Sequence, residues 1–173
     1  MFCNAIILHT KRLEEDKVQI TAFTHDYGKR VFYNRLWQKS TGLNAGCYGL
    51  YTATGRYLEA QEPHYPVLSA AHMRAVGHVL SFLQKCLPLE DPHPHLYHHI
   101  ESFLKPTNNS IIIQYQRLWG VMFTALGFAL DTLPSYIHNF SMPAPTCAYT
   151  IRQTMRCIQN HQQHIENELL SLR

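Results

Sequence analysis

The stretch IILHTKRLEEDKVQITAFTHDYGKRVFYNR, from Ile6 to Arg35, contains the residue pattern from which the fold of the N-terminal part of the chain can be predicted. Apolar and polar residues alternate in its KVQITAF segment, and this period of two predicts a half-buried strand. The HDYG that follows predicts a tight turn, because Gly28 can adopt a positive φ angle without steric cost. Together with the apolar run Ile6–Leu8 and with KRVFYNR, the stretch predicts three short strands.

Two further β-type runs, CYGLYTA and RYLEAQ, follow and meet at Thr54-Gly55. Five short strands within about 65 residues, joined by tight turns, are typical of a small closed or partly closed barrel. A fragment of a β-sandwich is the main alternative.

The chain changes character after EPHYP, the segment Glu62–Pro66, where the apolar residues begin to recur with a helical period. A first helix is expected after a Ser69 cap, with its inward face formed by Met73, Val76, Val79, Leu80 and Leu83. A second is expected after an Asp91 cap with Pro92 in its first turn, and its inward residues are Leu96, Ile100, Phe103 and Leu104. Two more helices are expected over Ile111–Phe128 and Thr150–Leu172. The sequence therefore predicts an α+β protein with a β-barrel over residues 1–66 and an all-α domain over residues 67–173.

Composition excludes several classes of protein. The longest apolar stretch, Leu118–Leu130, is too short to cross a bilayer, and no charged segment precedes the apolar residues at the N-terminus as in a signal peptide. Five cysteines are scattered without CxxC spacing, so neither a disulfide framework nor a zinc site is expected. We expect a cytoplasmic protein with free thiols and no membrane partner.

The excess of basic over acidic residues lies in the N-terminal part of the chain. Residues 1–40 contain seven Lys and Arg against four acids, although the formal net charge of the whole chain is only +3. Aromatic residues are interleaved with these charges near Tyr33 and Trp37. A groove that binds single-stranded nucleic acid needs cations for phosphates and aromatic faces for bases. A merely solvated strand face is the alternative.

The segment HPHLYHH places four imidazoles, His93, His95, His98 and His99, within seven residues. His95 and His99 have the i, i+4 spacing of helical zinc ligands, but no HExxH motif and no second ligand cluster accompany them. A histidine-rich surface helix that retains nickel during purification is the simpler interpretation. Because no motif for a nucleophile or a phosphate-binding loop is present either, we do not expect an enzyme.

Three segments, in the same order, resemble the RecO family of bacterial recombination mediators. AIILHTKRLEEDKVQITAFTHDYGKR (Ala5–Arg30) is similar to the family's opening, with F-T-x-x-x-G-[RK] at its end. LPLEDPHPHLYHHIESFL (Leu87–Leu104) resembles L-P-E-x-x-P-x-P-x-L-[YF]. QRLWGVMFTALGFALD (Gln116–Asp131) resembles R-F-E-L-x-L-L-x-x-L-G-[YF]-G-[LV]-D.

The resemblance implies an N-terminal OB-fold followed by a helical domain. It implies a DNA repair protein that binds single- and double-stranded DNA without sequence preference, anneals strands, and helps to load RecA with RecR as its partner. It also implies contact with the C-terminal tail of the single-stranded DNA-binding protein. Arg117 occupies the position of the motif's arginine and is the candidate for the carboxylate of that tail.

The chain departs from the family pattern at several positions. Arg35-Leu36-Trp37-Gln38 stands where the family has K-G-A-R, Trp119 replaces a glutamate, and the family's four-cysteine zinc module is absent. We therefore expect a shortened member without zinc or any other cofactor. The residues expected to contact DNA are, for phosphates, Lys11, Arg12, Lys29, Arg30 and Arg35 and, for base stacking, Tyr33 and Trp37. The alternative function is an adaptor that binds RecR or the tail with little direct DNA contact.

Overall fold

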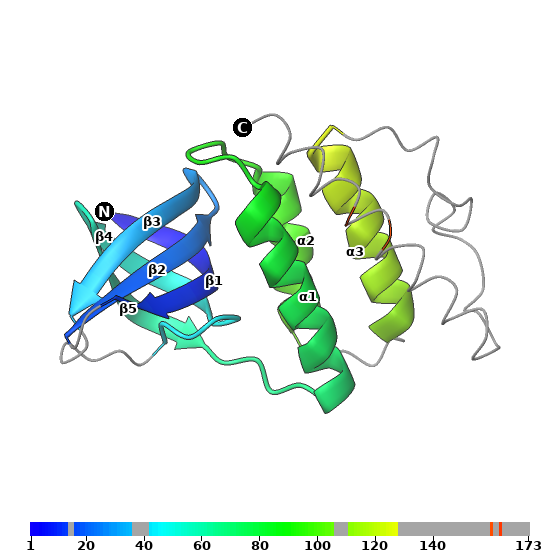
Figure 1. Ribbon diagram of the computed structural model, residues 1–173, viewed down its shortest axis with the longest axis horizontal. Helices are drawn as coiled ribbons and strands as arrows, with labels where there is room; N and C mark the ends of the chain where they lie inside the picture. Colours follow the sequence, from blue (N-terminus) through cyan, green and yellow to red (C-terminus); the bar gives the residue numbers. More distant parts are fainter. Residues whose placement is uncertain (14–15, 36–41, 106–110, 128–159, 161–162, 164–173) are drawn as a thin grey trace. The chain divides into compact units, whose positions relative to one another are not determined.

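The computed structural model describes residues 1–13, 16–35, 42–105 and 111–127, together with 160 and 163. These residues form five strands followed by three helices (Figure 1), so the α+β class predicted from the sequence is confirmed. The strands are β1 (Phe2–Arg12), β2 (Lys17–Thr24), β3 (Gly28–Arg35), β4 (Tyr48–Thr54) and β5 (Tyr57–His64), and the helices are α1 (Ala70–Cys86), α2 (Pro94–Leu104) and α3 (Ile111–Ala125).

The five strands belong to one antiparallel sheet with the order β3-β2-β1-β4-β5. The alternation expected from KVQITAF holds, because Val18, Ile20 and Ala22 lie in the core while Gln19 and Thr21 do not. The residues of β1 that lie in the same core all come from the first part of the strand, up to Ile7. The register of its pairing with β2 shifts by one residue between Ile7 and His9. Such a bulge bends the strand and re-aims its later side chains.

The two edge strands of this sheet are also joined to each other. The Tyr33 N–H donates to the carbonyl of Arg56 at 2.7 Å. The amide of Asn34 accepts from the Leu58 N–H at 3.0 Å and donates to the Leu58 carbonyl. The Asn34 side chain thus joins β3 to β5, and one backbone bond joins β3 to the β4–β5 turn, although β3 and β5 are the outermost strands of the sheet.

The turn between β2 and β3 forms where HDYG predicts it. Gly28 has a φ of +67°, and a Cβ built on it would lie 2.1 Å from the carbonyl oxygen of Asp91. Glycine is therefore required both by the backbone conformation and by the close approach of the α1–α2 connection. The Thr24 hydroxyl donates to the carbonyl of Gly28 at 2.9 Å and closes the turn.

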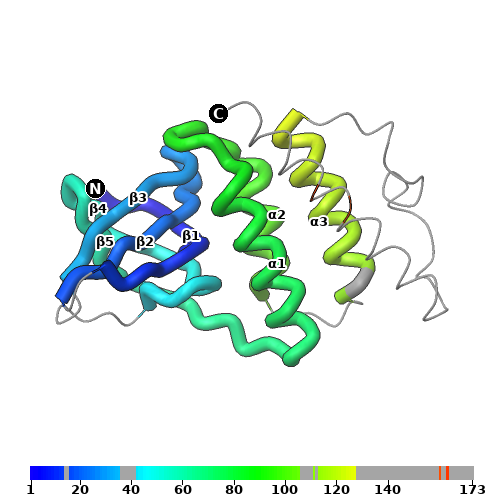
Figure 2. Tube along the Cα trace, viewed as in Figure 1, coloured from blue at the N-terminus to red at the C-terminus, as the bar shows by residue number. Residues whose placement is uncertain are grey.

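Helix α1 begins where it was predicted, because the Ser69 hydroxyl accepts from the His72 N–H at 3.3 Å. Its buried face includes Val76, Val79, Leu80 and Leu83, as expected. Met73 was wrongly placed on this face: its side chain is 43% exposed, and His72 is buried instead. Figure 2 follows the chain from β5 into this helix.

Helix α2 is capped differently from the prediction. His93, and not Asp91, is the N-cap residue, and its side chain makes no capping bond; Pro94 occupies the first turn. The four inward residues predicted from the helical period are nevertheless all buried. The His72 imidazole contacts the Phe103 carbonyl at 2.8 Å and connects α1 to α2. The ring of Phe23 in β2 packs 5.7 Å from that of Tyr97, so α2 also packs against the sheet.

Contacts divide the chain into two compact units, Met1–Pro106 and Thr107–Arg173. Helices α1 and α2 therefore group with the sheet, whereas the sequence prediction divided the chain at residue 66. In the second unit α3 buries residues including Trp119 and Met122, and Gly127 follows its end with a φ of +78°. The helix expected over Thr150–Leu172 lies outside the described residues, apart from 160 and 163, which are helical. Among the described helices, none is long and apolar enough to span a membrane.

Candidate functional site

The outward face of the sheet gathers basic and aromatic side chains from three strands. In the strand register Lys11 pairs with Gln19, Gln19 pairs with Tyr33, and one step along the same face Lys17 pairs with Arg35. Directly paired residues of antiparallel strands share a face, and the alternate residues of β2 and β3 point into the core. Lys11, Lys17 and Arg35 are exposed, and Tyr33 is 37% exposed.

The β4–β5 hairpin brings two more such residues to this face. The backbone bond between Tyr33 and Arg56 places the hairpin turn beside β3. Arg56 is exposed, and Tyr57 is 53% exposed. We name this set the basic–aromatic face; it consists of Lys11, Lys17, Tyr33, Arg35, Arg56 and Tyr57.

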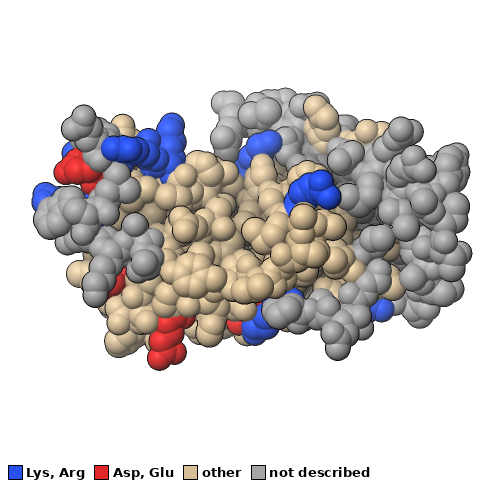
Figure 3. Space-filling model, turned by 90° about the horizontal axis from the view of Figure 1, so that it is seen from below, with Lys and Arg blue, Asp and Glu red and all other residues tan. Residues whose placement is uncertain are grey.

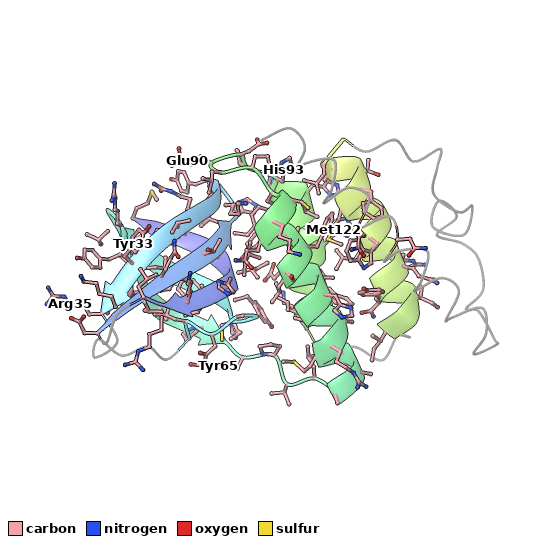
Figure 4. The ribbon with its side chains drawn as sticks, in the orientation of Figure 1. Tyr33, Arg35, Tyr65, Glu90, His93 and Met122 are labelled. Carbon is pink, nitrogen blue, oxygen red and sulfur yellow. The ribbon has the colours of Figure 1, made fainter. Side chains whose placement is uncertain are left out.

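The surface is hollowed beside the basic–aromatic face. A depression of about 530 Å³ is lined by Asn34, Arg35, Thr52, Thr54, Tyr57, Leu58 and Glu59. Figure 4 shows Tyr33 and Arg35 on β3, toward the end of the strand that is farther from Glu90. Figure 3 shows a group of Lys and Arg side chains with Asp or Glu side chains beside it, and further Lys and Arg side chains elsewhere on the same view. Arg12, at the end of β1, is exposed. It pairs with Val18, a core residue, and is therefore not a member of the basic–aromatic face.

Lys29 does not belong to the basic–aromatic face, and its burial disfavours the predicted role as a phosphate contact. Its side chain is only 7% exposed, and its ammonium group donates to the Gln84 carbonyl in α1 at 3.0 Å. Its own carbonyl accepts from the Glu90 N–H at 3.0 Å. Lys29 therefore joins β3 to α1 and to the α1–α2 connection.

Arg30 lies at the same end of β3 as Lys29 and is engaged locally. Its guanidinium is 3.9 Å from the carboxylate of Glu90. It also lies 5.9 Å from the ring centroid of Tyr27 and 5.9 Å from that of Phe32. The side chain is 32% exposed. The structure thus separates Lys29 and Arg30 from Tyr33 and Arg35, which the sequence had placed in one set.

Two further site predictions have different outcomes. Trp37, proposed to stack on bases, lies outside the described residues. Arg117 is exposed on α3, and its neighbours Leu118 and Trp119 are buried. An exposed arginine beside an apolar helix face is compatible with binding a carboxylate, and this role remains a prediction.

The histidines of HPHLYHH are dispersed over α2 and its N-terminus. The rings of His95 and His99 stack with their centroids 5.1 Å apart. Partial burial lowers the pKa of His99, and the neighbouring His95 and His98 lower it further. His98 instead meets His25 of the β2–β3 turn, with the two Nε2 atoms 3.2 Å apart. Among the described residues no group of three or more His, Cys, Asp or Glu side chains could hold a metal ion.

The described thiols fit the role of small buried apolar side chains. Cys3, Cys47 and Cys86 are free and buried. Burial raises the pKa of Cys3 and of Cys47, so little reactive thiolate forms near neutral pH. Cys147 and Cys157 lie outside the described part of the chain.

The chain was compared with protein families and with curated proteins. No family model matches it, and no curated protein shows significant similarity to it.

Proposed function

We propose that the protein is a DNA-binding protein of the RecO type whose sheet is an OB-fold barrel. The five-stranded sheet, together with the bonds that join β3 to β5, supports this fold. OB-folds bind oligonucleotides on strands 2 and 3 and on the loops between strands 1 and 2 and between strands 4 and 5. In this chain β2, β3 and the β4–β5 turn carry Lys17, Tyr33, Arg35 and Arg56, and the adjoining ends of β1 and β5 add Lys11 and Tyr57.

One observation carries the proposal: the strand register and the β4–β5 turn place four cations and two tyrosines on a single exposed face. Lys11, Lys17, Arg35 and Arg56 come from four different segments of the chain. Tyr33 and Tyr57 supply rings of the kind on which bases stack. Such a face binds single strands without sequence preference, since cations recognise phosphates and every base has a π-face.

The proposed activity needs no catalytic step. Phosphate contacts release counterions, and stacking holds unpaired bases apart from one another and available for pairing with a complementary strand. In this proposal the protein anneals complementary DNA strands in the cytoplasm and also binds duplex DNA through phosphates. RecR and the tail of the single-stranded DNA-binding protein are its protein partners, and RecA is loaded as a result.

The test is fluorescence anisotropy with a labelled single-stranded oligonucleotide over a salt series. The double variant Arg35→Ala/Arg56→Ala should bind more weakly, and the magnitude of the slope of log K against log salt should fall by about 1.4, at about 0.7 per phosphate contact. Tyr33→Ala/Tyr57→Ala should weaken binding by about 30-fold or more with little change in slope, because stacking contributes about 1–3 kcal/mol per base and two rings are removed.

The control variant is Arg74→Ala, which removes an exposed positive charge from α1, away from the proposed face. It should leave the salt slope unchanged. Equal effects of the Arg35/Arg56 and Arg74 changes would mean that binding reflects net charge and not this face. Absence of binding even at low salt would refute the proposal.

The second candidate function is an adaptor with little direct DNA contact. Two observations favour it: the net charge is only +3, and Arg117 is exposed on α3. In that case a peptide with the sequence of the tail of the single-stranded DNA-binding protein should bind the full chain, and Arg117→Ala should abolish binding. Retention of peptide binding in this variant would remove Arg117 from the site.

A further inference from the structure

His25 and His98 come from segments 73 residues apart, yet their Nε2 atoms lie 3.2 Å from each other. His25 stands in the β2–β3 turn, and its backbone N–H donates to the Asn4 carbonyl at 3.0 Å. His98 stands on α2. The ring of His25 also packs edge-on against Tyr97, with the centroids 5.5 Å apart. The turn and the buried tyrosine hold the His25 ring in place.

The second nitrogen of each ring faces a carboxylate. His25 Nδ1 lies 2.6 Å from Asp26 Oδ1, a hydrogen-bond distance, and His98 Nδ1 lies 3.7 Å from Glu101 Oε2. An ionised carboxylate draws the single proton of a neutral imidazole to the nearer nitrogen. With both protons on Nδ1, the two Nε2 lone pairs can bind one cation between the rings; with a proton on one Nε2, the same contact is a hydrogen bond.

The distance between the two nitrogens fits a metal ion. Two imidazole nitrogens bound to one zinc ion at about 2.0–2.1 Å are about 3.4 Å apart in tetrahedral geometry and about 2.9 Å apart in octahedral geometry. The observed 3.2 Å lies between these values. A carboxylate on the other ring nitrogen is the usual companion of a metal-binding histidine, because it fixes the tautomer and orients the ring.

We propose that His25 and His98 form a binding site for a divalent late transition-metal ion, of which Zn²⁺ is the example tested below. Imidazole nitrogen suits this class of metal. The side chain of His98 is 65% exposed, so the remaining coordination positions are open to water. The site is independent of the proposed DNA binding, and a bound ion would join the β2–β3 turn to α2.

The site differs from the one that HPHLYHH indicated. Only His98 of that segment takes part, and its partner His25 lies outside it. His95 and His99 provide a matched control, because they are two histidines on the same helix whose rings stack on each other.

The test is calorimetric titration of ZnCl₂ into the untagged full chain after treatment with a chelator. The wild type should bind one Zn²⁺ at this site, and His98→Ala should weaken binding at least tenfold. His25→Ala should do the same. Asp26→Asn should weaken binding about 10- to 100-fold, because it removes the carboxylate that orients His25. His95→Ala/His99→Ala should leave the affinity within about twofold of the wild type.

Thermal unfolding supplies a second measurement. Saturating ZnCl₂ should raise the Tm of the wild type and of the His95/His99 variant by several degrees, because the ion binds the folded state. It should not raise the Tm of His98→Ala, an exposed position where alanine favours the helix. Three results would each overturn the proposal: unchanged affinity in His98→Ala, loss of affinity in His95→Ala/His99→Ala, or no binding by the wild type. If the wild type does not bind Zn²⁺, the contact between the two rings is a hydrogen bond and not part of a metal site.

Discussion

Replacing Asn34 by alanine should destabilise the unit Met1–Pro106, because its side chain joins two strands of the sheet. The Asn34 side chain is 8% exposed and joins β3 to β5 through both the N–H and the carbonyl of Leu58. Alanine at this position removes both of these bonds, while the backbone bond from Tyr33 to Arg56 in the β4–β5 turn is retained.

The magnitude follows from the two groups left behind. A buried N–H or carbonyl that loses its partner costs about 1–3 kcal/mol. Because Leu58 is fully buried, its N–H and its carbonyl would both be left without this partner, and the expected loss is about 2–6 kcal/mol. Asn34 lines the depression beside Tyr57, so water can enter there and the lower half of this range is expected.

The assay is urea unfolding followed by fluorescence and circular dichroism. With an m value of about 1–3 kcal/mol per molar urea, the midpoint should fall by about 1–2 M. Asn44→Ala, at an exposed loop position, should change stability by less than about 0.5 kcal/mol. A loss below about 1 kcal/mol for Asn34→Ala would refute the argument that this side chain holds β3 to β5.

Three further changes test other contacts. Lys29→Met should cost about 1–3 kcal/mol by removing the donor to the Gln84 carbonyl, and should leave the salt slope of DNA binding unchanged; a smaller slope would return Lys29 to the DNA contacts. Gly28→Ala should cost about 2–4 kcal/mol in urea unfolding, since its Cβ would meet the Asp91 carbonyl at a positive φ, and a neutral result would contradict that geometry. Burial raises the pKa of Cys47, so its labelling by a disulfide reagent at pH 8 should be much slower in the native protein than in urea, and equal rates would show that the thiol is accessible.

The sequence predicted the secondary structure well where a single local rule applied. The period of two in KVQITAF, the positive φ of Gly28 and the Ser69 cap are properties of a few neighbouring residues, and all three are confirmed. Met73 was misplaced because it lies at the margin of the apolar stripe of α1. Which residue at such a margin is buried depends on what packs there, and the contact of His72 with Phe103 decides it.

The candidate site was predicted only in part, because sequence proximity is a poor guide to the face of a strand. Arg30 and Arg35 are five residues apart in β3, so they lie toward opposite ends of the strand, and the alternation of side chains puts them on opposite faces. Arg56 and Tyr57 were not predicted at all. They reach Tyr33 through pairing between the ends of the sheet, which no local pattern encodes.

The order and type of the elements could be predicted from the sequence alone: five strands with their turns, then helices with apolar faces, and a surplus of positive charge near the N-terminus. Periodicity and turn chemistry are local, so they can be recognised without any knowledge of the fold. Three features emerge only from the three-dimensional fold: which charged residues share a surface, the burial of Lys29 against α1, and the contact of His25 with His98. These pairings depend on strand register and helix packing, which bring together residues as many as 73 positions apart.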